Sequence, residues 1–274
     1  PQGSDLWKTT YGNIAPRVGV AYLMNRNSRF NTVLRTGAGL FYDTSTVQAS
    51  EGYWYGLGIT GTLNLNNKPF PLNAEQLNAI PAPSPVLTAS SYANIFAFDP
   101  NLKLPYALQW NATVEQQLGA DQTLSVGYVG SEGKRLLLSR QLYPDRVGNP
   151  NFAAGSSFLY ATTNGSSSNY HSLQAQFRRH ISKGLQVLSS YTWAHAIDDA
   201  TSNFTSSTLL RASSNYDIRH NFQAAISYDL PRGYSHSALR ALLGGWGIDT
   251  RIAARSALPV DVVASTQISP SGLS

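Results

Sequence analysis

Hydrophobic and polar residues alternate with a period of two over several segments of this 274-residue chain. In the segment 221–230 the even positions are Phe, Ala, Ile, Tyr and Leu, and the odd positions are Asn, Gln, Ala, Ser and Asp. Similar alternation occurs at 108–118, 171–178, 185–197 and 246–255. Successive side chains of a β-strand point to opposite faces, so the pattern predicts strands with one apolar and one polar face. The predicted strands are 13–22, 31–43, 105–118, 122–130, 169–180, 185–197, 214–230 and 244–256.

The connections between these strands alternate in length. The shorter ones are 23–30, 119–121, 181–184 and 231–243, and the longer ones are 44–104, 131–168 and 198–213. Such alternation puts all the long loops at one end of an up-and-down sheet, as in outer-membrane barrels with short periplasmic turns and long extracellular loops. We therefore expect an all-β fold, an antiparallel up-and-down meander that is part of a transmembrane outer-membrane β-barrel. The tight turns should pair 105–118 with 122–130, and 169–180 with 185–197.

The polar faces predict which side of the sheet meets water. They are rich in Gln, Asn, Thr, Asp and Arg, which suits a wet or plugged lumen better than a packed core. Trp110, Trp193 and Trp246 lie on the apolar face near strand ends, where the aromatic girdles of membrane barrels occur. The apolar faces should therefore point outward to lipid. The convex surface is expected to carry Leu173, Phe222, Tyr228 and Ile248.

Composition agrees with a membrane surface. Charged residues make up 13% of the chain, about half of the share in a typical soluble domain, whereas aromatic residues make up 11%. No run of about 18 apolar residues occurs, so no transmembrane helix is expected, and barrel strands leave no such hydropathy peak. The net charge of +5 comes from scattered basic residues, which do not make a nucleic-acid-binding patch. The absence of cysteine excludes disulfides and cysteine metal sites.

No set of residues with the spacing of a catalytic or metal site is present, so we expect no enzyme activity, no cofactor and no metal. The five histidines lack paired metal-ligand spacing and are expected at strand ends or on the surface. Asp198 and Asp199, with Ser202 and Asn203, leave Ca²⁺ binding as a weaker alternative. The segment 130–135 is expected to be a hairpin tip. A short helix is predicted at 73–80, with Asn73 as N-cap and Gln76 at the third helical position.

Eight segments, in order along the chain, resemble strands of a known family. Examples are NIAPRVGVAY at 13–22 and LRTGAGLFYD at 34–43. The others are 109–119, 128–133, 169–174, 190–199, 217–222 and 244–246. Together they are similar to TonB-dependent outer-membrane receptors, in particular the Oar-like branch, whose members often carry a carboxypeptidase-regulatory-like domain.

The resemblance implies a barrel of about 22 strands, closed by a plug domain and driven by TonB from the inner membrane. It also implies residence in the bacterial cell outer membrane, with lipid, the TonB system and an unknown ligand as partners. The chain has too few strands and no plug, and its N-terminus lacks a signal peptide. We therefore expect residues 1–274 to be an internal piece of the barrel domain. Its free edges should be 13–22 and the segment around 258–264.

The long loop 44–104 is the best candidate for ligand capture. It is rich in proline and nearly uncharged, and aromatic rings on a loop held by a rigid scaffold suit binding by stacking and burial. Alternatively, these rings pack the loop onto itself or onto the plug. The candidate residues are Tyr53, Trp54, Tyr55, Phe70, Tyr92, Phe96 and Phe98. Two other functions stay open: a complete outer-membrane barrel of about eight to ten strands with a structural or adhesive role, and a soluble secreted β-sandwich that binds carbohydrate.

Overall fold

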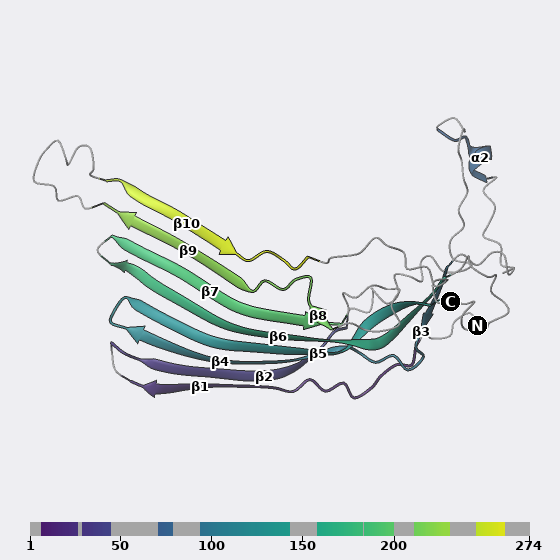
Figure 1. Ribbon diagram of the computed structural model, residues 1–274, viewed down its shortest axis with the longest axis horizontal. Helices are drawn as coiled ribbons and strands as arrows, with labels where there is room; N and C mark the ends of the chain where they lie inside the picture. Colours follow the sequence, from purple (N-terminus) through teal and green to yellow (C-terminus); the bar gives the residue numbers. More distant parts are fainter. Residues whose placement is uncertain are drawn as a thin grey trace, which may run out of the picture.

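The strands of the computed structural model form one curved sheet (Figure 1). The structure describes residues 7–26, 29–44, 71–78, 94–142, 158–182, 184–199, 211–230 and 245–260. The main path is an antiparallel meander in the order β1-β2-β4-β5-β6-β7-β9-β10, so the predicted fold class is confirmed. Its strands are β1 (Arg17–Asn25), β2 (Thr32–Tyr42), β4 (Tyr106–Leu118), β5 (Gln122–Leu142), β6 (Phe158–Ser182), β7 (Leu185–Asp198), β9 (His220–Asp229) and β10 (Gly247–Arg255).

Two tight turns set the register of the sheet. Gly119 begins the turn between β4 and β5 at φ +75°, and Gly184 ends the turn between β6 and β7 at φ +79°. Glycine takes this left-handed conformation without the steric cost that other residues bear. Both turns lie at the left end in Figure 1, and the long connections leave from the opposite end. The predicted pairing of β4 with β5 and of β6 with β7 is confirmed.

The two faces of the sheet differ as predicted. Leu173 pairs with Tyr128 and Trp193, and the neighbouring Gln174 pairs with Gly127 and Thr192 on the other face. The apolar face is exposed rather than packed: Leu173 is 45% exposed and Ile248 is 56% exposed. Among the described residues the only buried hydrophobic side chains are Leu102, Leu138 and Ala194. A β-sandwich requires two sheets that pack their apolar faces together. The described strands form one sheet with an exposed apolar face, so the β-sandwich alternative is wrong.

The strands β5 and β6 are longer than predicted, at 21 and 25 residues. The sequence predicts that the first of them ends at residue 130, because the Gly- and Ser-containing segment 130–135 has the composition of a hairpin tip. In the structure β5 continues through this segment, and its register with β6 shifts between Gly133 and Leu136 and again before Leu138. Arg135 has φ 55° at this irregularity. A β-bulge therefore occurs where the sequence predicts a turn. Glycine is common in bulges as well as in turns, so composition alone does not separate the two.

The predicted loop 44–104 contains β3 (Asn94–Phe98), which pairs in parallel with β6. This is an exception to the predicted meander of sequential antiparallel neighbours. Further along the chain, β8 (Ala212–Ser213) pairs with β7. Strand β9 begins at His220 rather than at 214. The backbone N–H of Asp217 donates to the carbonyl of Ser214, and this hydrogen bond closes a turn ahead of the strand.

The predicted short helix is confirmed as α2 (Ala74–Asn78). The backbone N–H of Gln76 donates to Asn73 Oδ1 at 2.8 Å, and the N–H of Asn73 donates to Gln76 Oε1 at 3.0 Å. This reciprocal pair is a capping box, as the sequence predicts. In the described part of the chain no helix is long and apolar enough to cross a membrane.

The described strands do not close into a ring. Strand β1 pairs with β2, strand β10 pairs with β9, and the two lie at opposite ends of the strand order. The predicted free edge at 13–22 therefore falls on β1. At the other end the edge strand is β10, not the predicted segment around 258–264; residues 258–260 are not in a strand, and the chain from 261 onward lies outside the described residues. A ring joining the first and last of these strands, which the complete-small-barrel alternative requires, is not formed by them.

Candidate functional site

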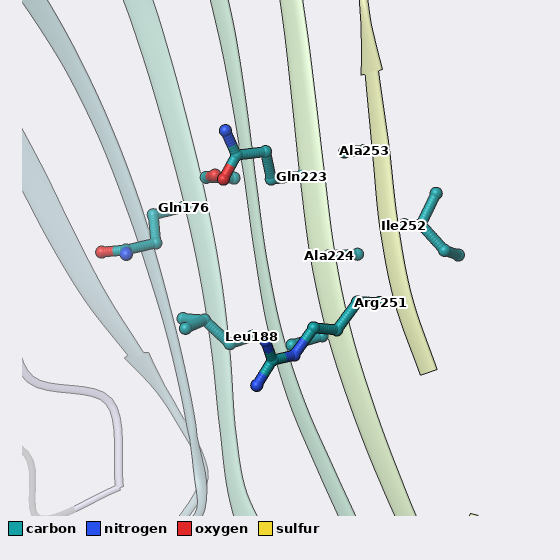
Figure 2. A pocket seen from close by; sticks show the side chains of 9 residues that line it. Gln176, Leu188, Gln223, Ala224, Arg251, Ile252 and Ala253 are labelled. Atoms are coloured by element: carbon teal, nitrogen blue, oxygen red, sulfur yellow. The ribbon is translucent and has the colours of Figure 1, made fainter. Parts of the chain in front are cut away.

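The polar face of the sheet forms a hollowed hydrophilic wall. One hollow of about 300 Å³ lies across β6, β7, β9 and β10 (Figure 2). In Figure 2 Gln176, Gln223 and Arg251 point to the same side of the sheet, and Ile252 points away from it. A smaller hollow of about 130 Å³ includes Glu115 and Arg178. Because these hollows lie over the polar residues, this face is the concave one, and the apolar face is convex as predicted.

Basic side chains are spread over this wall without ion pairing. Arg178 pairs in register with Leu188, which pairs with Ala225, which pairs with Arg251, so both arginines lie in one row. Arg35 and Arg255 lie on the same face. Among the described residues, no salt bridge involves any of these four arginines. Guanidinium groups between amide and hydroxyl side chains can bind anionic and hydrogen-bonding groups of a polar partner.

At the long-loop end, the segment after β3 is fixed to β6 by one side chain. Asn164 Oδ1 accepts from the backbone N–H of Lys103 at 2.7 Å, and Asn164 Nδ2 donates to the carbonyls of Lys103 at 2.8 Å and Arg135 at 2.7 Å. The backbone N–H of Asp99 donates to the carbonyl of Thr162 at 3.0 Å, and Leu102 is buried. The loop therefore has an ordered base on the barrel wall.

Of the predicted ligand-binding residues, only one can be placed with its side chain. Phe98 ends β3, and its ring centroid lies 5.5 Å from that of Trp7. Phe96 lies within β3, and its side chain falls outside the described residues. The remaining candidates also lie outside them: Tyr53, Trp54, Tyr55, Phe70 and Tyr92. Whether these rings meet stays a prediction.

The contact between Trp7 and Phe98 is one that sequence reasoning missed. It lies ahead of the first strand, yet the adjacent Lys8 donates from its backbone N–H to the carbonyl of Pro100 at 3.0 Å and from Nζ to Asn101 Oδ1 at 2.9 Å. Both Trp7 and Phe98 are half-buried. The only available signal was an aromatic residue outside any predicted strand, and this signal does not name a partner.

A second tie holds the chain that follows β7. Asp199 Oδ2 accepts from Ser167 Oγ at 2.6 Å and from the Ser167 backbone N–H at 3.0 Å, and Oδ1 accepts from Arg211 at 3.0 Å. Burial alone would raise the pKa of Asp199, but the hydrogen bonds from Ser167 and Arg211 outweigh it and hold the pKa below its usual value. The weaker Ca²⁺ alternative places a metal ion on this carboxylate. In the structure the carboxylate accepts a hydrogen bond from the Arg211 guanidinium.

A third cluster surrounds a buried carboxylate. Asp217 is 6% exposed, and its Oδ1 accepts from the backbone N–H of Ala196 at 2.8 Å. Its Oδ2 lies 3.0 Å from His195 Nδ1 and 3.3 Å from Arg219. The described residues contain no group of three or more His, Cys, Asp or Glu side chains placed to hold a metal ion. Through its bonds to Ala196 and His195, Asp217 joins the turn before β9 to β7.

Comparisons with known proteins bear on the family. A family model described as "Outer membrane beta barrel domain" matches residues 1–274. No curated protein sequence matches this chain. The chain is similar to a chain in the structure of the FpvAI–pyocin S2 complex, with 13% identity, a TM-score of 0.44, and coverage of 80% of this chain and 21% of that one.

A second solved structure gives a comparable result. It is the outer membrane transporter YddB from Escherichia coli, with 10% identity, a TM-score of 0.43, and coverage of 72% of this chain and 24% of that one. This chain therefore spans about a quarter or less of the length of both proteins. From the family match over its whole length, the chain belongs to the outer membrane beta barrel domain family and resides in the bacterial outer membrane.

Proposed function

We propose that this chain is part of the barrel wall of a TonB-dependent transporter of the Oar-like branch, and that its long loops capture the ligand. The observation that carries the proposal is the built base of the long loop at one end of the sheet. There β3 pairs with β6, and Asn164 holds Lys103 through both its backbone N–H and its carbonyl. A loop on such a base is suited to present a binding surface.

The inner wall supports the transport part of the proposal. A barrel wall that packs against apolar residues would carry large hydrophobic side chains inward, whereas this face carries Gln, Ser, Thr and Arg around open hollows. Such a wall suits a solvated passage or a folded polar plug domain. Under this proposal the plug and the TonB contact come from outside residues 1–274, and the chain itself contributes no catalytic chemistry.

The long-loop end is assigned to the cell exterior in this proposal. Outer-membrane barrels have short periplasmic turns and long extracellular loops. The turns at Gly119 and Gly184 therefore face the periplasm, and β3, Asn164 and the Trp7–Phe98 contact face the medium. The predicted aromatic residues of the loop, from Tyr53 to Phe98, would supply the ligand-binding rings.

The test uses the whole protein in its own bacterium. Strains with and without the gene take up a defined mixture of labelled large polar solutes, and each strain is measured with TonB active and inactive. We expect at least one solute to depend on both the protein and TonB. Uptake that depends on the protein but not on TonB would contradict the TonB assignment, and unchanged uptake of every solute on deletion would contradict transport.

A variant at the loop base tests ligand capture. Asn164→Leu removes three hydrogen bonds at the loop base and leaves the strand pairing of the membrane part in place. We expect weaker binding of the solute identified above at an unchanged protein level in the outer membrane. Gln117→Leu, near the periplasmic turn, is the matched control and should bind as the wild type does.

A further inference from the structure

Histidine and aromatic side chains gather at one level of the apolar face. We call them the histidine belt, and they are Trp110, Tyr128, His171, Tyr191, Trp193, His195 and His220. In the register of the sheet Trp110 pairs with Gly130, Gly130 with His171, and His171 with His195, which forms one row across four strands. Trp193 pairs with Leu173 and with His220 in the next row toward the short turns.

The belt contains the same tyrosine–histidine pair twice, once between β5 and β6 and once between β7 and β9. Tyr128 Oη lies 2.7 Å from His171 Nδ1, with the rings stacked at 18°. Tyr191 Oη lies 2.8 Å from His220 Nδ1, with the rings stacked at 17°. The Trp110 ring flanks His171 with a centroid distance of 6.1 Å. Aromatic girdles explain tryptophan and tyrosine at such a level, but they do not explain histidines held in a fixed orientation.

The third histidine is held by a carboxylate. His195 Nδ1 lies 3.0 Å from the buried carboxylate of Asp217, and the Arg219 guanidinium lies on the same carboxylate oxygen. The Arg219 side chain is itself 41% exposed, which adds an accessible positive charge beside the belt. In all three histidines, then, Nδ1 is engaged by a neighbouring side chain.

The engaged Nδ1 atoms determine what the other ring nitrogen offers. When the tyrosine hydroxyl donates to Nδ1, the neutral ring carries its proton on Nε2, and in the imidazolium both nitrogens are donors. No side chain in the described part of the chain hydrogen-bonds to Nε2 of His171 or of His220, and both residues are exposed. The belt therefore presents N–H donors among the aliphatic and aromatic side chains of this face.

The belt lies at the depth of a membrane interface. On β4, Trp110 stands eight residues from the strand end at Leu118. On β6, His171 stands eight residues from Arg179, which lies in the same row as Leu118 because both pair with Gln122. Eight residues rise about 26 Å along a strand, or about 20 Å along the membrane normal at a tilt of about 40°. This is close to the apolar band of about 25 Å that outer-membrane barrels show.

We propose that the histidine belt binds the phosphate headgroups of lipids in the leaflet at the long-loop end. Headgroup phosphates are anionic, rich in acceptor oxygens, and located where an apolar face meets water. The belt supplies the complement: imidazole N–H donors, the exposed Arg219, and flat rings that cover the adjoining acyl chains. The proposal rests on the family and on the two faces of the sheet, and it stands apart from the transport assignment.

The test compares two lipids that differ in phosphate alone. The full-length protein is reconstituted in nanodiscs of phosphatidylcholine that contain a small share of either phosphorylated lipid A or the same lipid A after dephosphorylation. Native mass spectrometry after release from the nanodisc gives the number of retained lipid A molecules. The wild type should retain the phosphorylated form in preference, and equal retention of both forms would overturn the proposal.

The double variant H171F/H220F keeps two rings and removes two donors. We expect its preference for the phosphorylated lipid to fall about 10-fold or more, as the loss of a charge-assisted hydrogen bond predicts. Y128F/Y191F leaves the histidines in place and removes only the hydroxyls that orient them, so it should lose part of the preference. It also decides the matter if the first variant does not fold.

The matched control is Phe177→Leu, which removes a ring from the same face of β6 nearer the short turn. This variant should retain the phosphorylated lipid as the wild type does. A preference that falls in F177L but persists in H171F/H220F would assign retention to ring area and would overturn the role of the imidazole N–H groups. An unchanged preference in both double variants would overturn the proposal as a whole.

Discussion

Trp110 lies directly over Gly130 on the neighbouring strand, so its indole ring fills the space that a side chain at position 130 would take. A Cβ built on Gly130 meets three atoms of that ring within 2.5 Å. The glycine in β5 therefore makes room for a tryptophan in β4, and this pairing holds the belt side chain flat against the sheet.

We expect Gly130→Ala to destabilise the barrel, because the added methyl group displaces the Trp110 ring. Overpacking of this kind costs about 1–3 kcal/mol. The free energy of unfolding, measured by urea titration in lipid vesicles, should show the loss. Gly19→Ala is the control, since a Cβ there meets nothing nearer than the Thr36 carbonyl at 3.9 Å. Equal stability of the two variants would contradict the displacement of Trp110.

An arginine introduced at two adjacent positions of β5 should affect the stability of the barrel to different degrees. Val126 lies on the convex apolar face and is 38% exposed, whereas Ser125 lines a hollow of the concave face. Val126→Arg should lower the free energy of unfolding in a bilayer by about 2–4 kcal/mol, the cost of arginine near the midplane of a membrane barrel. Ser125→Arg should change it little. A larger loss in the Ser125 variant would mean that the two faces are reversed.

The two turn glycines should differ in sensitivity. Both have positive φ, which costs a residue with a side chain about 1–2 kcal/mol. A Cβ on Gly184 would also stand 2.6 Å from the Asp229 carbonyl, whereas one on Gly119 meets nothing within 4 Å. We therefore expect Gly184→Ala to be less stable than Gly119→Ala in the same urea titration. The reverse order would show that Asp229 can move away from the turn at low cost.

The tie of Asp199 to Ser167 predicts a pH dependence. The folded pKa of Asp199 lies below its usual value, so the stabilisation by this carboxylate is present above the ordinary carboxyl pKa of about 4. It is lost as the pH falls through the lowered folded pKa. Exchange protection of the Ser167 amide, corrected for intrinsic rate, should be constant between neutral pH and about pH 5 and decline in stronger acid.

The matching substitution for this carboxylate is Asp199→Asn. It should lower the protection of the Ser167 amide at neutral pH, because the charge-assisted bond to Arg211 is lost. Asp121→Asn, in the turn at the opposite end of the sheet, serves as the control and should leave Ser167 unchanged. Protection that persists in the Asp199 variant at every pH would contradict the tie.

The sequence predicts the part of the fold in which local rules decide the structure. Alternation places Leu173 and Gln174 on opposite faces, and glycine at the tight turns sets the pairing of the strands. The capping box of Asn73 and Gln76 is also a local pattern, and it forms as expected. Each of these features involves residues that are neighbours in sequence or directly across a hairpin.

The features that the sequence does not predict depend on distant contacts. The segment 130–135 has the composition of a turn, but pairing with β6 keeps it in a strand as a bulge. Strand β3 lacks a hairpin partner, and its ladder is supplied by residues more than 60 positions later. The contact of Trp7 with Phe98 joins the start of the chain to a distant loop. No local periodicity encodes such pairs.

The parallel pairing of β3 with β6 has a consequence for the order of assembly. Hairpins such as β4–β5 close short stretches of chain, whereas β3 pairs with residues of β6 that follow it by 64 positions, with β4 and β5 in between. The entropy of closing so long a stretch is recovered only when this pairing forms. We therefore expect the loop base to form after the hairpins, so that the outer end of the loop is the last part of the wall to be fixed.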